Sequence, residues 1–93
     1  MERWWFVLAL VFLSPVQAAP SRAEMLAAPC FACHGVDGVG AGDIPRLDVE
    51  AQRIEVKMID FKDPDARGTI MPRIARGYTA EEIELIADYL GTR

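Results

Sequence analysis

Two cysteines and the chain's one histidine lie within five consecutive residues, Cys30-Phe31-Ala32-Cys33-His34. Two thiols at this spacing can each form a thioether with a vinyl group on the same edge of a porphyrin, and C-x-x-C-H is the attachment signature of a c-type haem. The adjacent imidazole can then bind the iron. The pentapeptide therefore predicts one covalently attached haem c, with Cys30 and Cys33 as thioethers and His34 as the proximal iron ligand.

Three other interpretations of this cluster are open from the residues alone. The two thiols could form a local disulfide. They could work as a thioredoxin-like redox pair, but that motif opens a helix after a strand in a βαβ unit, and no such unit is visible. They could bind zinc with His34, but the chain has no fourth cysteine or histidine to complete a tetrahedral site.

The second axial ligand is expected to be a methionine, because the chain has no second histidine. Met25 lies on the first expected helix and Met58 on an apolar helical stripe, so both are expected to pack. Met71 lies in Thr69-Ile70-Met71-Pro72, which we expect to be a loop in which Pro72 favours an extended Met71. We predict Met71 as the distal iron ligand. A His/Met pair fills both axial positions, which suits electron transfer.

The elements that must position these residues are expected to be three helices around a loop-rich middle. Ser21-Arg22-Ala23-Glu24 fits a capping box for a short helix that ends at about Ala28. Four glycines between residues 35 and 42 indicate an irregular segment. Asp48 is then expected to cap a second helix that runs to about Lys62.

The third expected helix begins at a second capping box, Thr79-Ala80-Glu81-Glu82, and ends near Gly91. The apolar residues of the second and third helices recur at helical spacing: Ile54, Met58 and Phe61, and then Ile83, Ile86, Ala87 and Leu90. No stretch shows sustained strand alternation. We therefore predict a small all-α fold packed around one covalently attached haem.

The length and charge of the chain limit its class. Its 93 residues allow one small domain, and a core this small usually needs a staple such as a bound cofactor. Ten Lys and Arg residues against fourteen Asp and Glu residues give a formal charge of -4. This net deficit of cations argues against nucleic acid as a partner, because binding the phosphate backbone requires a clustered basic excess.

The first 18 residues fit a secretory signal peptide. An apolar run of ten residues, Trp4 to Leu13, follows Arg3, and the small-x-small sequence Val16-Gln17-Ala18 comes after it. We predict removal of residues 1–18, a single monohaem domain in residues 19–93, and a periplasmic location without stable membrane insertion. The alternative is an uncleaved anchor, although a membrane span needs about 20 apolar residues.

Two further residues are weaker candidates for contact with the haem. Arg73 follows the expected ligand loop, where it could pair with a haem propionate or be an ordinary surface charge. Tyr78 could pack on the porphyrin or cap the final helix.

The expected domain, residues 19–93, resembles class I cytochromes c, which carry one haem with His/Met ligation. The matching features are Cys30-Phe31-Ala32-Cys33-His34-Gly35, the glycine loop that leads to Ile44-Pro45-Arg46-Leu47, the segment Thr69-Ile70-Met71-Pro72 and the closing amphipathic helix. The resemblance implies that the Pro45 carbonyl accepts a hydrogen bond from the ligand histidine, which fixes the ring and raises its basicity.

Roughly the last half of the chain has a narrower resemblance. Asp60-Phe61-Lys62 and the segment from Arg67-Gly68-Thr69 to Gly77-Tyr78-Thr79 resemble the cytochrome subunit of flavocytochrome c sulfide dehydrogenase. In that family a flavoprotein subunit oxidises sulfide and the cytochrome takes electrons from its flavin. The resemblance implies a flavoprotein partner.

These observations lead to one preferred function and two alternatives. We expect electron transfer with no catalysis by the chain itself, as the haem subunit of a sulfide-oxidising flavoenzyme. The first alternative is a free carrier that feeds an oxidase or a photosynthetic centre. The second is a small thiol–disulfide protein that uses Cys30 and Cys33.

Overall fold

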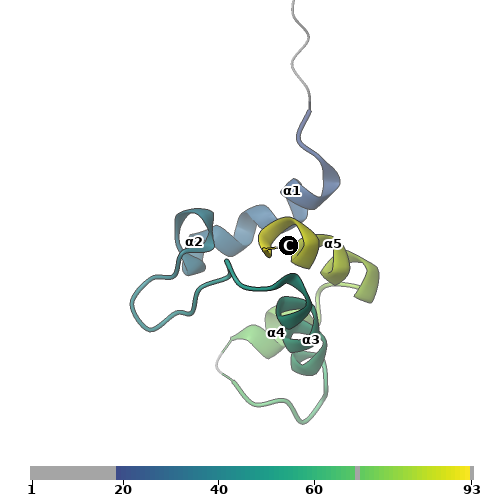
Figure 1. Cartoon of the computed structure of the whole chain (residues 1–93). Coiled ribbons are helices and arrows are strands. Elements are labelled where there is room, and N and C mark those ends of the chain that lie inside the picture. The colour runs from purple at the N-terminus through teal and green to yellow at the C-terminus, as the bar shows by residue number, and fades with distance from the viewer. Residues whose placement is uncertain (1–18, 69, 93) are drawn as a thin grey trace, which may run out of the picture.

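The structure is a computed structural model that describes residues 19–68 and 70–92, so the expected signal peptide, residues 1–18, lies outside the described residues. Within these residues the chain forms short helices joined by loops (Figure 1). In order they are α1 (Arg22–Ala27), the 3-10 helix η2 (Ala28–Cys30), α2 (Phe31–His34), the 3-10 helix η3 (Val36–Gly38), α3 (Ala51–Phe61), α4 (Met71–Ala75) and α5 (Ala80–Leu90).

The all-α class expected from the sequence is confirmed. In residues 19–68 and 70–92, extended pairing is limited to two isolated bridges, Ala41 with Ile44 and Glu50 with Thr92. The longest described helices, α3 and α5, have 11 residues each. None of the described helices is long and apolar enough to cross a membrane.

The first helix begins and ends at the residues that its sequence indicates. The Ser21 hydroxyl accepts a hydrogen bond from the Glu24 backbone N–H at 3.1 Å, which satisfies one of the free amides in the first turn. α1 ends at Ala27, and Pro29 lies in the first turn of η2, where a proline's missing N–H costs nothing. This arrangement carries the chain directly into the cysteine motif.

The second expected helix begins later than predicted, so the assignment of Asp48 as its cap is wrong. α3 begins at Ala51, with Glu50 in the N-cap position. Asp48 instead accepts hydrogen bonds from the Arg46 guanidinium, with Nε 2.7 Å from Oδ1. Both oxygens of the carboxylate are engaged by Arg46, and this contact takes them away from the start of the helix.

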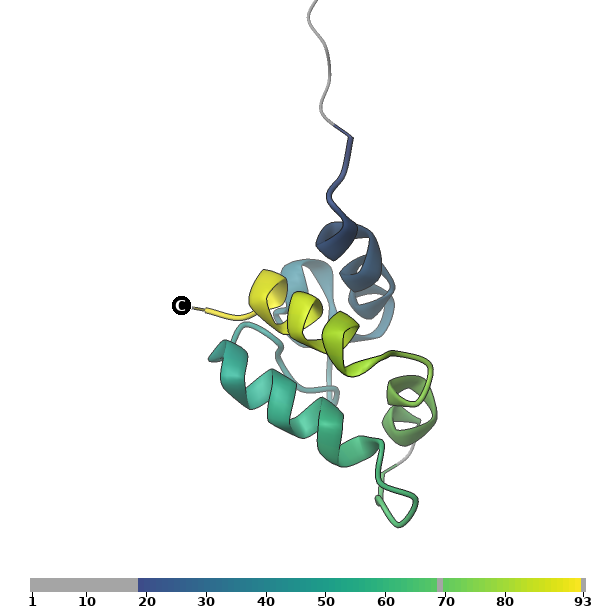
Figure 2. The same ribbon diagram turned by 90° about the vertical axis from the view of Figure 1, so that its right-hand side faces the viewer.

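The final helix joins the two halves of the fold. Its capping box is complete, because Thr79 accepts from Glu82 N–H and the Glu82 carboxylate accepts from Thr79 N–H. α5 packs against α1 and α3, and α3 packs against α4; Figure 2 shows α5 between α1 and α3. The apolar stripes of α3 and α5 face each other in a core cluster with α4, formed by Ile54, Met58, Ala75, Ile83 and Ala87.

The chain after α5 returns to the start of α3. Thr92 N–H donates to Val49 O at 2.8 Å, and Ala51 N–H donates to Thr92 O at 3.3 Å. The Thr92 carbonyl therefore takes one of the first amides of α3, the role that Asp48 was expected to fill. The approach requires a glycine at 91, because a Cβ there would lie 2.5 Å from the Ala51 Cα.

Candidate haem site

Three consecutive short helices position the cysteine motif. Cys30 is the last residue of η2, and Cys33 and His34 end α2. Cys30 is half-buried and Cys33 is exposed, and no disulfide joins them. Burial raises the pKa of the Cys30 thiol, and the local backbone hydrogen bond only partly opposes this rise. The helical turn presents both thiols and the imidazole toward one cavity.

The orientation of the His34 ring is fixed by a backbone carbonyl. Its Nδ1 lies 2.7 Å from Pro45 O, so Nδ1–H donates and Nε2 is left with its lone pair as the nitrogen that can bind a metal. His34 is buried, with 8% of its surface exposed. A hydrogen bond of this kind holds the ring in one tautomer and raises the basicity of Nε2.

The glycine loop between His34 and Pro45 makes this hydrogen bond possible. Gly40 N–H donates to His34 O at 2.7 Å, and Leu47 N–H donates to Gly38 O at 2.7 Å. Gly35 has φ of +88°, and a Cβ at this position would lie 2.5 Å from Gly40 O. Only glycine fits such a position without strain. The loop therefore folds back beneath the imidazole and brings Pro45 to it.

A cavity of about 530 Å³ brings the predicted haem residues together. Cys30, Cys33 and His34 line it from η2 and α2, and Met71 lines it from α4. The remaining lining side chains come from the loop before α3, from α3 itself, from Ile70 and from the end of α5: Asp43, Ile44, Pro45, Arg46, Leu47, Val49, Arg53, Ile54, Lys57, Met58, Phe61, Ile86 and Leu90.

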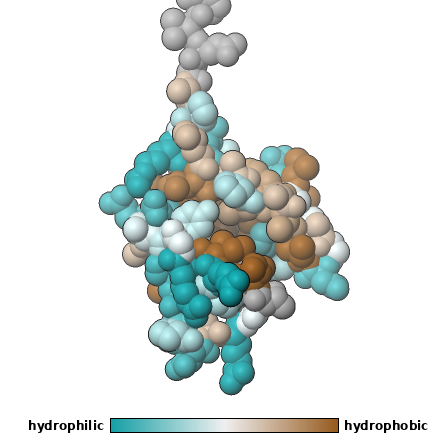
Figure 3. All heavy atoms as spheres, turned by 180° about the vertical axis from the view of Figure 1, so that it is seen from behind, coloured by the Kyte–Doolittle hydropathy of each residue, from teal (hydrophilic) through white to brown (hydrophobic). Residues whose placement is uncertain are grey.

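These residues fit a covalently attached haem. Two thiols and an imidazole lie in one part of the lining, a thioether sulfur comes from a different helix, and most of the other side chains are hydrocarbon. Large apolar side chains are also exposed on the surface of the described chain, among them Val36, Ile44 and Ile70. The view from behind shows hydrophobic side chains gathered in the middle of that face, framed by hydrophilic ones (Figure 3).

The expectation that Met71 lies extended in a loop is wrong. Met71 is the first residue of α4, and Pro72 follows it in the first helical turn. A proline is tolerated there because that turn's N–H groups have no helical acceptor. Met71 is half-buried and packs against the core cluster. Met58 also lines the cavity and is buried in the core, whereas 64% of Met25 is exposed.

The two weaker candidates lie away from the cavity. Arg73 is exposed on α4 and does not line it. Tyr78 also does not line it, but packs against the core cluster. Burial raises the pKa of the Tyr78 phenol, and Cys30 and Glu82 raise it further. Haem contact by either residue stays a prediction.

Two cationic residues of the lining were missed by sequence reasoning. Arg53 and Lys57 lie on α3 and reach the cavity. Their positions immediately precede Ile54 and Met58 of the apolar stripe, so helical geometry places them along the edge of that stripe. This periodicity was the signal that could have found them.

Residues 21–93 match the cytochrome c family. The chain belongs to the cytochrome c family: it carries a covalently bound haem c and transfers electrons through its iron. Membership of this family agrees with the helical fold and with the cavity that Cys30, Cys33, His34 and Met71 line together. It does not favour a thioredoxin-like or zinc-binding role for the two cysteines.

Relatives within the family differ in length. The chain is 46% identical over 72 residues to the cytochrome subunit of sulfide dehydrogenase from Chlorobaculum tepidum, a match that covers 76% of this chain and 66% of that subunit. It is 32% identical over 74 residues to cytochrome c-553 from Desulfomicrobium norvegicum, with 75% of this chain and 92% of that protein covered. It is 33% identical over 87 residues to cytochrome c-553 from Helicobacter pylori, with 89% and 88% covered.

Proposed function

We propose that this chain is the haem-bearing subunit that accepts electrons from a sulfide-oxidising flavoprotein. The observation that carries the proposal is the 46% identity with the Chlorobaculum subunit, which covers most of this chain. The Asp60-Phe61-Lys62 and Arg67-to-Thr79 segments, which resemble that subunit family in sequence, support it. Phe61, Ile70 and Met71 of these segments line the cavity.

Within this function Cys30 and Cys33 are the thioether attachments, His34 the proximal ligand and Met71 the distal ligand. The convergence of these four side chains on one cavity supports the assignment. When bound, the haem iron supplies a one-electron couple between its ferric and ferrous states. Pro45 holds the His34 ring through its 2.7 Å hydrogen bond, and α4 holds the Met71 thioether against the core.

The hydrocarbon lining has its own part in this function. Around a bound haem, side chains such as Ile54, Ile86 and Leu90 would exclude water from the porphyrin surface. Lower solvent access disfavours the extra positive charge of the oxidised centre, so the lining raises the potential together with the neutral Met71 sulfur. Because the packed core supports both ligands, the chain can hold them in place while an electron arrives and leaves.

The ligand assignment is tested by replacing Met71 with alanine. The variant should lose the weak long-wavelength absorption band of Met-bound ferric haem, and its potential should fall because the thioether ligand is gone. Met25→Ala, which changes an exposed methionine, is the matched control and should keep both properties. A Met71→Ala protein with the native band and potential would contradict the assignment and point to Met58.

The partner assignment is tested with sulfide. The purified holoprotein is mixed anaerobically with sulfide, with and without the flavoprotein subunit of a sulfide dehydrogenase, and haem reduction is followed by absorbance. We expect rapid reduction only when the flavoprotein is present, together with a complex in analytical ultracentrifugation. If the rate is the same without the flavoprotein and no complex forms, the subunit role is wrong, although the haem site would be unaffected.

The expected removal of residues 1–18 and the periplasmic location belong to the same proposal. Thioether attachment of haem takes place outside the cytoplasm, and the apolar run after Arg3 supports export. Mass spectrometry of the protein from a host that matures c-type cytochromes should give a chain that begins at Ala19. A haem-loaded chain that retains Met1 would instead indicate an anchor.

A free electron carrier is the second candidate. The two cytochromes c-553 have about the same length as the matched region, with 92% and 88% of their chains covered. On this alternative the protein sediments alone, and its haem is oxidised by a terminal oxidase or a photosynthetic centre. The ultracentrifugation experiment above therefore separates the two candidates.

A further inference from the structure

Only a few of the side chains that line the cavity are charged, and they come from two neighbouring segments. Two of its charged residues, Asp43 and Arg46, belong to the loop before α3, and the other two, Arg53 and Lys57, belong to α3. The remaining lining is formed by the haem residues and apolar side chains. The lining therefore has three cationic side chains and one anionic side chain.

The loop cation already has a partner. The Arg46 guanidinium bonds both carboxylate oxygens of Asp48, and this contact lowers the pKa of the Asp48 carboxyl. Because the Asp48 carboxylate already offsets the charge of this guanidinium, Arg46 attracts a second carboxylate less strongly than an unpaired cation does. Arg46 is therefore a poor candidate to bind an anion in the cavity.

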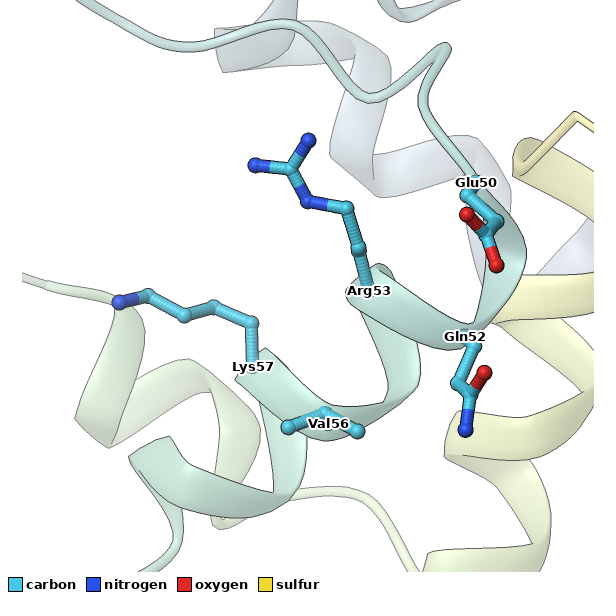
Figure 4. Close-up of a pocket in the computed structure, with 5 residues that line it drawn as sticks. All are labelled: Glu50, Gln52, Arg53, Val56 and Lys57. Atoms are coloured by element: carbon cyan, nitrogen blue, oxygen red, sulfur yellow. The ribbon is translucent and has the colours of Figure 1, made fainter.

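The two cations of α3 are differently placed. Arg53 and Lys57 are one helical turn apart, and Figure 4 shows both side chains extending from the same side of α3, away from Gln52. Among the described residues neither is ion-paired with a carboxylate, and Lys57 Nζ lies 5.4 Å from the Phe61 ring centroid. Like charges at this spacing slightly destabilise a helix, and an anion between them would offset that cost.

We propose that Arg53 and Lys57 bind the two propionate carboxylates of the haem. A guanidinium can hold one carboxylate through two parallel hydrogen bonds, and an ammonium can hold the other as a point charge. Both residues line the same cavity as Cys30, Cys33 and His34. α3 would then bind the haem through its cations as well as through Ile54 and Met58.

This proposal moves the expected propionate contact from α4 to α3. Arg73, the residue that the sequence suggested, is exposed and does not line the cavity. Arg53 and Lys57 act on the haem through charge and are positioning residues. Their positive charge stabilises the ferrous state relative to the ferric state and favours ionised propionates.

The test measures the haem reduction potential against pH in the holoprotein. Arg53→Gln, Lys57→Gln and the double variant should lower the potential at neutral pH. They should also raise the propionate pKa that the curve reports, by about one unit for each lost cation. Arg53→Lys and Lys57→Arg keep the charge and should restore most of both shifts. Arg73→Gln is the matched control and should leave the curve unchanged.

The other groups in the lining are controlled separately. Asp43→Asn removes the acidic side chain of the lining, and Arg46→Gln tests the paired loop cation. An unchanged ferric absorption spectrum shows that each compared variant keeps both ligands. If the double variant keeps the native potential and propionate pKa, or if Arg73→Gln produces the larger shift, the proposal is wrong.

Discussion

At the residue scale, the His34 imidazole depends on a backbone that only glycine can adopt. The His34 carbonyl accepts from Gly40, and the Pro45 carbonyl accepts from the His34 ring. Both contacts require the chain to turn immediately after the histidine, at Gly35. The glycine beside the motif is therefore part of the ligand's support.

Replacing Gly35 with alanine should destabilise the holoprotein by roughly 1–3 kcal/mol. The added Cβ would lie 2.5 Å from Gly40 O at a positive φ, so the loop must shift. Gly42→Ala is the matched control, because Gly42 also has positive φ but open space around its Cβ position. Denaturant unfolding followed by far-ultraviolet circular dichroism measures both. Equal losses in the two variants would mean that the close contact contributes nothing beyond the backbone strain.

Tyr78 is predicted to lower the free energy of unfolding at alkaline pH. Burial raises the pKa of its phenol above the ordinary value of 10.0, and the Glu82 carboxylate raises it further. A raised pKa in the folded state means that stability is full below pH 10 and is lost as the pH rises through the folded pKa, because the unfolded phenol ionises first.

Tyr78→Phe should therefore flatten the decline in unfolding free energy above pH 10 relative to the wild type. The comparison uses denaturant titrations of the holoprotein between pH 8 and 11. Parallel curves for the wild type and Tyr78→Phe would show that the phenol does not contribute.

At the scale of elements, the sequence predicted the longer helices better than the shorter ones. The capping boxes at Ser21 and Thr79 and the apolar stripes predicted α1, α5 and most of α3. α4 was not predicted. A helix of five residues cannot form alone, because nucleation is costly, and this one exists because Ala75 is fully buried in the core cluster.

The same difference applies to the candidate site. C-x-x-C-H is a local pattern, so the sequence alone predicted its three haem residues. Asp48 faced two competing partners, the start of a helix and Arg46, and local sequence could not rank them. Periodicity places Arg53 and Lys57 at the edge of the apolar stripe of α3, but the packing of α3 against α5 decides that this edge borders the cavity.

The contact between the end of α5 and the start of α3 makes a prediction for Gly91. Gly91→Ala should lower the unfolding free energy by roughly 1–3 kcal/mol, because the new Cβ would lie 2.5 Å from the Ala51 Cα. Gly91 has φ of -77°, so backbone strain does not add to the loss. Gly77→Ala, where the nearest atom would be 3.3 Å away, is the control and should cost less than about 1 kcal/mol. Thermal unfolding of the holoproteins decides between them.

At the scale of the whole molecule, the described core is too small to specify the fold without haem. Its buried hydrophobic residues are Ala27, Ile54, Met58, Ala75, Ile83, Ile86 and Ala87, and three of them are alanines. Many of the other apolar side chains line the cavity. Without haem that lining faces water, and the lost burial is large relative to the marginal stability of a small domain.

A Cys30→Ala/Cys33→Ala variant without attached haem should therefore lose most of its helical circular dichroism and its cooperative thermal transition. The wild-type holoprotein, prepared in the same host, is the control. A native-like spectrum with a sharp transition in the haem-free variant would show that the polypeptide core suffices, against this expectation.

The return of Thr92 to Val49 and Ala51 has a consequence for motion. The hydrogen bonds at 2.8 and 3.3 Å close the chain from Val49 to Thr92 into a ring of tertiary structure, and Met71 belongs to that ring. The entropy lost on closure is incurred once, when the protein folds. Melting of α4 within the closed segment would release Met71 from the cavity and leave the closure at Thr92 intact. Hydrogen exchange of the Ala51 and Thr92 amide protons would tell whether the closure opens in the same event.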